Sequence, residues 1–302
     1  MKYRILGSTE LNVSVIGVGT WQFGGEWGQT FSQADVDAIF DEARTRNINL
    51  IDTAECYGDH LSEQLVGRAI ARDRDQWVVA TKFGHKFHAP FERTEPRSPQ
   101  DIRVQLEESL KALRTDVVDL YQYHSWSDES FFDDDVLAVL NQARDEGKIR
   151  HIGNSVGSNR NVKQLEKSRE MGIETIQIVY NRLDRGPEEA GIFDLCRGQN
   201  LGVLARVPLA SGYLSGKYQP GHSFEASDVR SRQPDDTRSQ RIAEALRIQT
   251  EEVPDGVPMA QWALAWCLRD PVVTCVIPGC RSAEQVASNA TASERLESVR
   301  LD

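Results

Sequence analysis

Eight short runs of apolar, often β-branched residues recur along the chain, and most of them are apolar at nearly every position. Strands of this kind are buried on both faces, which is typical of a parallel sheet covered by helices. Because eight such strands alternating with helices close into a barrel, this feature constrains the fold more than any other. The predicted strands are residues 14–20, 47–52, 77–82, 117–124, 149–155, 175–181, 201–208 and 272–278.

Helical patterns occupy the segments between these runs. Ser/Asp and Ser-Pro start signals precede apolar residues that repeat on one face. Since consecutive βαβ units are right-handed and close on themselves after eight repeats, we predict a single (β/α)₈ TIM barrel of class α/β. The predicted helix starts are Ser32-x-x-Asp35, Ser98-Pro99, Ser62, Asp135, Asn161 and Pro258.

Two segments interrupt the repeat. Residues 1–13 hold two short strand patterns joined by a Gly-Ser-Thr-Glu turn, which predicts an N-terminal β-hairpin that caps the bottom of the barrel. Residues 211–240 are rich in glycine, serine, aspartate and arginine, and a loop of that length in a compact domain is usually functional or disordered. No linker or shift in composition divides the chain, so we expect one domain over residues 1–302.

Composition limits the partners and the compartment. The 302-residue chain has a formal net charge of −11, which makes it a poor binder of nucleic acid or anionic membranes. No apolar run approaches the roughly 18 residues of a membrane span, and the first residues lack a signal-peptide core. Five scattered cysteines without a Cys-x-x-Cys pair predict reduced thiols. We expect a cytoplasmic protein that binds neither nucleic acid nor membrane; homo-oligomerisation stays open.

Four chemically distinct polar residues follow neighbouring predicted strands. Asp52 ends the second strand and Tyr57 follows it, Lys82 ends the third, and His124 ends the fourth. Each alone has an ordinary interpretation, such as a turn cap for Asp52 or a solvated end for Lys82. In a barrel, however, the C-terminal strand ends meet at one mouth, where catalytic residues lie. The four together predict a catalytic site.

This set suits proton transfer to an oxygen during carbonyl reduction. A tyrosine with its usual pKa near 10 is a poor acid–base at neutral pH, but a neighbouring ammonium favours the phenolate. Asp52 would keep Lys82 charged and oriented, and the His124 imidazole would hydrogen-bond the carbonyl oxygen. Tyr57 is therefore the predicted proton donor.

A second group of residues indicates an anion site. Gly- and Ser-rich segments follow the seventh and eighth predicted strands, and Ser282 and Gln285 occupy the N-cap and N3 positions of a new helix. In barrels of this kind these loops and a helix N-terminus bind phosphate. Lys217 and Arg281 would add positive charge. A dinucleotide could then lie across the mouth with its reactive ring over Tyr57.

The motifs that carry these residues resemble those of a known family. They are Leu6-Gly7, Val13-Ser14-x-Ile16-Gly17-x-Gly19-Thr20-Trp21, Asp52-Thr53-Ala54-x-x-Tyr57-Gly58, Thr81-Lys82, Asp119-Leu120-Tyr121-Gln122-x-His124, Ile149-Arg150-x-Ile152-Gly153, Gln177-x-x-Tyr180-Asn181, Pro208-Leu209-Ala210-x-Gly212-x-Leu214-x-Gly216-Lys217-Tyr218 and Val276-Ile277-Pro278-Gly279. In this order they resemble the aldo-keto reductases, especially the longer bacterial and potassium-channel β-subunit-like branches, over essentially the whole chain.

The resemblance implies a (β/α)₈ barrel that binds NADP(H), in preference to NAD(H), and reduces an aldehyde or ketone, sugar-like carbonyls included. It implies Asp52, Tyr57, Lys82 and His124 as the catalytic residues. The loop at 211–240 would fold over the cofactor. The implied cofactor contacts are Thr20, Trp21, Ser155, Gln177, Arg206, Pro208, Leu209, Ser211, Gly212, Leu214, Gly216, Lys217, Arg230, Gly279, Arg281, Gln285 and Asn289. The candidate walls of the substrate pocket are Trp21, Trp126, Tyr57, His124, Phe23 and Tyr180.

Four positions depart from the family pattern. Val156 stands where many relatives have an asparagine, and Arg206 stands where many have a tyrosine or tryptophan that stacks on the nicotinamide. Gly279 and Gln285 occupy the places where the best-known branch has a lysine and an arginine that clamp the 2′-phosphate. Arg281 is the expected replacement for that clamp.

Two alternatives remain at this point. The first is a nicotinamide-binding regulatory subunit related to the channel β-subunits. The second is a metal-dependent barrel hydrolase, for which His85-x-x-His88 is the only spaced histidine pair.

Overall fold

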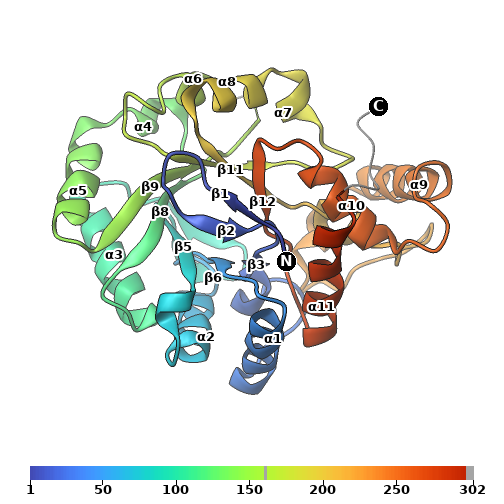
Figure 1. Ribbon diagram of the computed structural model, residues 1–302. Helices are drawn as coiled ribbons and strands as arrows, with labels where there is room; N and C mark the ends of the chain where they lie inside the picture. Colours follow the sequence, from blue (N-terminus) through green and yellow to red (C-terminus); the bar gives the residue numbers. More distant parts are fainter. Residues whose placement is uncertain (160–161, 297–302) are drawn as a thin grey trace.

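A closed barrel of parallel strands ringed by helices forms the molecule (Figure 1), and the computed structural model describes residues 1–159 and 162–296. Its strands follow the order β12-β11-β10-β9-β8-β5-β4-β3. Parallel bridges from Ile16 to Val276 and from Gly19 to Gly279 close the sheet, which confirms the predicted (β/α)₈ fold. The strands are β3 (Val18–Gly19), β4 (Leu50–Asp52), β5 (Val78–Phe83), β8 (Val118–His124), β9 (Ile149–Ser155), β10 (Thr175–Val179), β11 (Gly202–Arg206) and β12 (Val273–Val276).

Helices cover the outside of the barrel. None of them, within the described ranges, is long and apolar enough to cross a bilayer. The α-helices are α1 (Gln33–Thr45), α2 (Leu61–Ile70), α3 (Pro99–Leu113), α4 (Asp128–Phe131), α5 (Asp134–Asp145), α6 (Val162–Glu166), α7 (Gly186–Glu189), α8 (Ile192–Gln199), α9 (Asp235–Glu251), α10 (Met259–Leu268) and α11 (Ala283–Thr291).

Local start signals position the best-defined helices. Ser32 and Ser98 each form a capping box with an aspartate three residues later, at the N-termini of α1 and α3. These predictions are confirmed, as is the start of α10 after Pro258. α2 begins one residue before Ser62, and α5 begins one residue before Asp135 because the side chain of Asp133 caps it. The predicted start at Asn161 lies outside the described residues.

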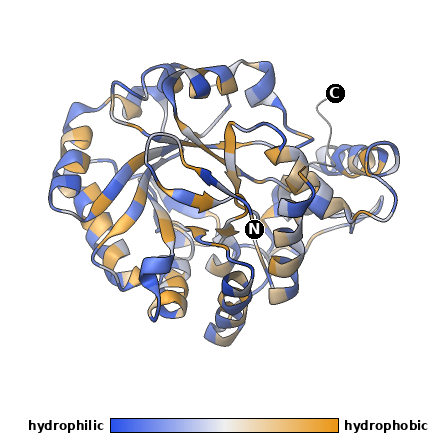
Figure 2. Ribbon diagram, viewed as in Figure 1, coloured by the Kyte–Doolittle hydropathy of each residue, from blue (hydrophilic) through white to orange (hydrophobic). Residues whose placement is uncertain are grey.

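Alternate residues of the strands face two different apolar clusters. Leu50 and Leu204 belong to a small cluster inside the barrel, whereas their neighbours Ile51 and Val203 belong to the large cluster under the helices. This alternation follows from the two-residue period of a strand. Apolar residues accordingly gather on the strands and on the inner sides of the helices (Figure 2).

The predicted N-terminal hairpin closes the end of the barrel at which the strands begin. It consists of the antiparallel strands β1 (Tyr3–Ile5) and β2 (Asn12–Ser14), so the first predicted barrel strand begins later than residue 14. Leu6 and Val13 of the hairpin complete the small cluster inside the barrel. Gly7 has a φ of +59° and lies so close to β11 that a Cβ atom would be 2.1 Å from the Gly202 nitrogen.

The interpretation of residues 211–240 as one long loop is wrong at its C-terminal end. The segment starts within a 3₁₀ helix (Ala210–Ser215) and contains another (Val229–Arg232), and α9 begins at Asp235. Asp235 and Asp236 indicated a loop by composition, but in the first turn of α9 they complement the helix dipole. A second hairpin, β6 (Lys86–Ala89) and β7 (Glu92–Thr94), follows β5 and was not predicted.

We expect Gly7→Ala to lower the free energy of unfolding by about 2–4 kcal/mol, because a side chain there requires both a left-handed backbone and movement of β11. Gly147→Ala is the matched control, since Gly147 also has a positive φ (+74°) but has nothing within 4 Å of its Cβ position. The free energy of unfolding of Gly147→Ala should fall by only about 1 kcal/mol. Urea unfolding of both variants measures the difference; equal losses would contradict docking of the hairpin on the barrel.

Candidate active site

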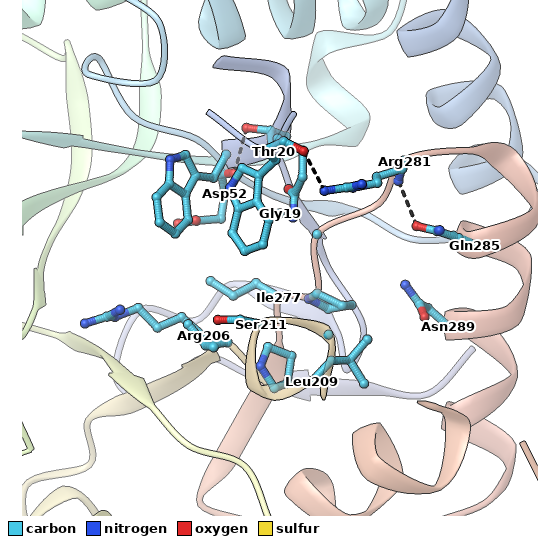
Figure 3. Close-up of a pocket in the computed structure, with 18 of the residues that line it drawn as sticks. Gly19, Thr20, Asp52, Arg206, Leu209, Ser211, Ile277, Arg281, Gln285 and Asn289 are labelled. Atoms are coloured by element: carbon cyan, nitrogen blue, oxygen red, sulfur yellow. Dashed lines mark hydrogen bonds between the residues drawn. The ribbon is translucent and has the colours of Figure 1, made fainter. Parts of the chain in front are cut away.

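A cavity of about 630 Å³ opens at the C-terminal ends of the barrel strands. The catalytic candidates Asp52, Tyr57 and His124 line one part of it. The loops after β11 and β12 line much of the rest, together with the segment after β3. Figure 3 shows Arg281, Gln285 and Asn289 at the opposite end from Asp52 and Arg206. The cavity is therefore elongated from the strand ends of the barrel centre toward α11.

The fully buried ammonium of Lys82 links three groups of this site. Its Nζ donates to Asp52 Oδ2 at 2.9 Å and to the carbonyl of Thr53 at 2.7 Å, and it lies 3.2 Å from Tyr57 Oη. Lys82 itself does not line the cavity but lies behind Tyr57. Neighbouring strands bring the groups together, since β4 pairs with β5 and places Asp52 beside Ala80, two residues from Lys82. The predicted convergence of Asp52, Tyr57 and Lys82 is thus present in the structure.

Burial and charge set the protonation states of these groups. Burial raises the pKa of Tyr57 to about 12, although the nearby Lys82 acts to lower it. Burial opposes the charge of Lys82, but the adjacent Asp52 and Tyr57 together outweigh this effect and hold the pKa of Lys82 above its usual value. At neutral pH the site therefore holds a protonated phenol beside a charged ammonium.

His124 completes the set as a neutral imidazole. Burial, with His85 and Lys82 nearby, places the pKa of His124 well below its usual value. The Cys56 Sγ lies 3.7 Å from His124 Nδ1, and burial raises the pKa of this thiol, so it stays protonated and can donate to Nδ1. The proton of the imidazole then resides on Nε2.

Cationic side chains outnumber carboxylates in the lining of the cavity although the chain is acidic. Among its described lining residues Asp52 is the one carboxylate. Two of the lining cations are held by contacts that also organise the site: Arg281 donates to the carbonyl of Trp27 at 2.9 Å, and Arg230 bonds Asp228. The cationic residues that line the cavity are Arg93, Arg206, Lys217, Arg230 and Arg281.

The segment before α9 folds back over the loop after β11. Arg230 donates to Tyr218 Oη at 2.6 Å and to the carbonyl of Ser211 at 3.2 Å. The backbone of Val229 donates to the carbonyl of Glu26 at 2.9 Å. These contacts hold the segment that includes Arg230 against the cavity. This is the place in which the loop at 211–240 was expected to lie.

α11 begins at the far end of the cavity. Its N-cap Ser282 accepts a hydrogen bond from the backbone of Gln285, as predicted, and Gln285 Oε1 accepts from the backbone of Arg281 at 2.9 Å. Figure 3 shows this Arg281–Gln285 contact. The N-terminus of α11 and the side chain of Arg281 are thus presented at the same end.

Most of the predicted contact residues line the cavity. Exceptions are Ser155, which lies behind it and donates to Gln177 Oε1 at 3.2 Å, and Leu214 and Gly216 in the loop after β11. The predicted contact residues that do line it are Thr20, Trp21, Gln177, Arg206, Pro208, Leu209, Ser211, Gly212, Lys217, Arg230, Gly279, Arg281, Gln285 and Asn289.

The assignment of Trp126 to the substrate pocket is wrong. Its side chain is buried and packs edge-on against Phe83 and Tyr123, at ring-centroid distances of 5.6 and 5.0 Å. Ser125 has a φ of +60°, and the tryptophan that follows it packs in the core. Phe23 and Tyr180 are also core residues rather than pocket walls. Trp21 does line the cavity, and its ring stacks on Tyr57 with centroids 6.0 Å apart.

The hairpin β6–β7 brings residues to the cavity that the sequence analysis did not assign there. Arg93 on β7 lines the cavity and forms an ion pair with the fully buried Glu26. Glu26 also accepts from Trp21 Nε1 at 2.9 Å. These contacts join segments far apart in the sequence, so no local pattern could reveal them. His85 also lines the cavity, and its position two residues after the end of β5 could have predicted this.

The histidine pair of the hydrolase alternative does not converge. The ring of His85 packs against His124, whereas His88 bonds to the hydroxyl of Thr94 on the exposed hairpin. Among the described residues, Glu55, Cys56 and His124 form the one group close enough to hold a metal ion. Burial raises the pKa of Glu55 to about 8 and raises that of the Cys56 thiol as well, so a metal ion would have to displace a proton from each of them.

Comparison with known proteins identifies the family. The model of the aldo/keto reductase family matches residues 15–298. The aldo-keto reductase YhdN of Bacillus subtilis (strain 168) is 32% identical over 297 residues, covering 95% of this chain and 87% of the relative. An NADH-specific methylglyoxal reductase of Escherichia coli (strain K12) is 33% identical over 311 residues, covering 97% and 93%.

A comparison with solved structures points to the same family. The holo form of the aldo-keto reductase AKR11C1 from Bacillus halodurans superimposes with a TM-score of 0.81 at 31% identity and covers 97% of this chain and 91% of that one. The chain belongs to the aldo/keto reductase family and is an oxidoreductase of that family. These relatives are reductases, so they give no support to the alternative of a regulatory subunit.

We expect Asp52→Asn to lower the free energy of unfolding by about 3–5 kcal/mol, because it leaves the buried ammonium of Lys82 without its counter-charge. Asp194→Asn is the control, since Asp194 pairs with Arg197 on the surface and is 83% exposed. Chemical denaturation at pH 7 compares the two. If Asp52→Asn were as stable as the control, the buried ammonium would not depend on Asp52.

Proposed function

We propose that this chain is an NADP(H)-dependent reductase of aldehydes or ketones, sugar-like carbonyls included, in which Tyr57 donates the proton. The observation that carries the proposal is the contact of Lys82 Nζ with Tyr57 Oη at 3.2 Å, beside a cavity large enough for a cofactor. Among the named relatives, one is described as a methylglyoxal reductase and another as an L-glyceraldehyde 3-phosphate reductase, which supports a small carbonyl substrate.

The cavity residues fit a nicotinamide dinucleotide. Five cations face a single carboxylate there, which suits a polyanionic ligand. Gln22 Oε1, Ser215 Oγ and Arg206 Nε are buried atoms of the lining that have no hydrogen-bond partner among the described residues. Buried polar atoms are normally paired, so these atoms are suited to bind the amide, hydroxyl and phosphate groups of such a ligand. When bound, the reduced cofactor supplies hydride to the carbonyl carbon.

Tyr57 is in the right state to act as an acid. With its pKa raised to about 12 by burial, the phenol carries its proton throughout the neutral range. When that proton passes to the substrate oxygen, the phenolate that remains is stabilised by the Lys82 ammonium beside it. Asp52 accepts hydrogen bonds from Lys82 and, at 2.6 Å, from Gln177 Nε2, so the whole set is held in place from three strands.

His124 orients the carbonyl. With its proton on Nε2, the neutral imidazole can donate a hydrogen bond to the substrate oxygen while Tyr57 donates the proton. Its ring is set nearly perpendicular to that of Tyr57, with centroids 6.1 Å apart. Both side chains line the cavity, so a carbonyl oxygen can lie between them.

The preference for NADP(H) rests on Arg281. It lies at the N-terminal end of α11, where free backbone N–H groups and the helix dipole already favour an anion. Asp228 Oδ2 is 3.8 Å from its guanidinium, so the charge of Arg281 is only loosely compensated. A 2′-phosphate could therefore be bound there by charge as well as by hydrogen bonds.

We expect Tyr57→Phe to bind NADPH within about threefold of the wild-type affinity but to reduce carbonyls at least about a thousandfold more slowly, because the proton donor is removed while the cavity keeps its shape. NADPH oxidation with a panel of aldehydes, ketones and sugars measures the rate, and fluorescence titration measures the affinity. Tyr3→Phe is the control, as the exposed Tyr3 bonds the carbonyl of Asn47 far from the cavity. Turnover retained by Tyr57→Phe would exclude Tyr57 as the acid.

Arg281→Ala should weaken NADPH binding by roughly ten- to a hundredfold and NADH binding by less than about threefold, because only NADPH carries the phosphate that the guanidinium would pair with. Arg247→Ala, on the exposed face of α9, is the control with the same loss of charge. Titration with both cofactors gives the four affinities. Equal losses for NADPH and NADH would overturn the assignment of Arg281 to the 2′-phosphate.

A further inference from the structure

Three cations lie at the catalytic end of the cavity, and two of them are neutralised by buried carboxylates. Lys82 pairs with Asp52, and Arg93 pairs with Glu26. Arg206 has no such partner: among the described residues no carboxylate forms an ion pair with it. Within residues 1–159 and 162–296 its one hydrogen bond runs from Nη2 to the carbonyl of Val156 at 3.1 Å, and its buried Nε has no partner there.

The backbone fixes where this charge lies. Arg206 is the last residue of β11, and its side chain reaches the segment after β9, where Val156 holds it. Figure 3 shows Arg206 at the same end of the cavity as Asp52, with its guanidinium directed away from Leu209. Burial lowers the pKa of Arg206, and the nearby Tyr57 and Asp52 act against this lowering. Arginine nevertheless keeps its proton in proteins, so the charge is permanent.

This position is the place where the reactive ring of the proposed cofactor must lie. Hydride has to reach a carbonyl carbon whose oxygen is between Tyr57 and His124, and the phosphates are assigned to the loops after β11 and β12. A cofactor bound in this way would place its ring near Tyr57 and the segment 208–212, at the end of the cavity that Arg206 also lines.

The charge of that ring changes in the reaction. The reduced dihydropyridine is neutral; when its hydride leaves for the carbonyl carbon, and the carbonyl oxygen takes a proton from Tyr57, the ring becomes a pyridinium cation. A fixed cation that forms no ion pair with a described carboxylate would repel a pyridinium bound beside it and would not repel the neutral ring. The interaction therefore discriminates between the two redox states of the cofactor.

We propose that Arg206 makes the site selective for the reduced cofactor and speeds release of the oxidised one after carbonyl reduction. The inference rests on the proposed function. An aromatic side chain at this position carries no net charge. It would contact the reduced and the oxidised ring without this charge repulsion. Arg206 thus acts on the cofactor as a specificity-determining residue and takes no part in the proton transfer.

The test measures the dissociation constants of NADPH and NADP⁺ separately, by quenching of the tryptophans Trp21 and Trp27 that line the cavity. We expect the wild type to bind NADPH at least about tenfold more tightly than NADP⁺, and Arg206→Gln to reduce that ratio by about tenfold, mainly by tightening NADP⁺. Glutamine keeps a donor for the carbonyl of Val156 but removes the charge. Arg206→Lys keeps the charge and should retain most of the ratio.

Arg185→Gln is the matched control, because Arg185 pairs with Glu188 outside the cavity and its loss should leave the ratio unchanged. A wild-type protein that binds the two forms equally, or an Arg206→Gln variant in which both constants change by the same factor, would overturn the proposal, and in either case the reductase function would stand. A wild-type protein that binds neither dinucleotide would overturn the proposed function itself, and this inference with it.

Discussion

The buried ammonium of Lys82 is the feature on which the rest of the site depends. A charge removed from water is costly by several kcal/mol unless it is paired and hydrogen-bonded. Asp52, the carbonyl of Thr53 and the hydroxyl of Tyr57 meet this requirement together. The same requirement fixes their positions, so the stability of the barrel core and the placement of the phenol at the cavity depend on one set of contacts. Gln177, on β10, extends the set by donating to Asp52.

The distribution of charge separates the cavity from the remainder of the molecule. The chain carries a formal net charge of −11, yet five cations and one carboxylate line the cavity. An anionic ligand is therefore repelled by much of the surface and attracted to this one opening, which favours both its capture and its orientation. The cations of the cavity differ in whether a carboxylate neutralises them. Arg93 forms an ion pair with Glu26, and Arg230 forms one with Asp228. Arg206 forms an ion pair with no described carboxylate. The proposed selectivity for the reduced cofactor follows from that difference.

Local signals predicted the parts of the fold that depend on neighbouring residues. The capping boxes at Ser32 and Ser98 and the apolar strand runs are short-range features, and the elements formed where these signals placed them. Composition was misleading at Asp235 and Asp236, which suggested a loop but begin α9, where acidic residues suit the first turn. A distant contact decided the outcome at Trp126, which suggested a pocket wall by its position after a strand but packs on Phe83 and Tyr123.

The sequence alone determined the barrel and the convergence of Asp52, Tyr57 and Lys82, because strand periodicity and the order of strand ends are properties of the chain itself. Only the tertiary structure decided which charges are compensated. The pairing of Glu26 with Arg93 spans 67 residues, and the isolation of Arg206 depends on which carboxylates every other strand end presents. Ion pairing in a low-dielectric interior depends on distances of a few ångströms, and such distances between remote segments are fixed only when the barrel closes.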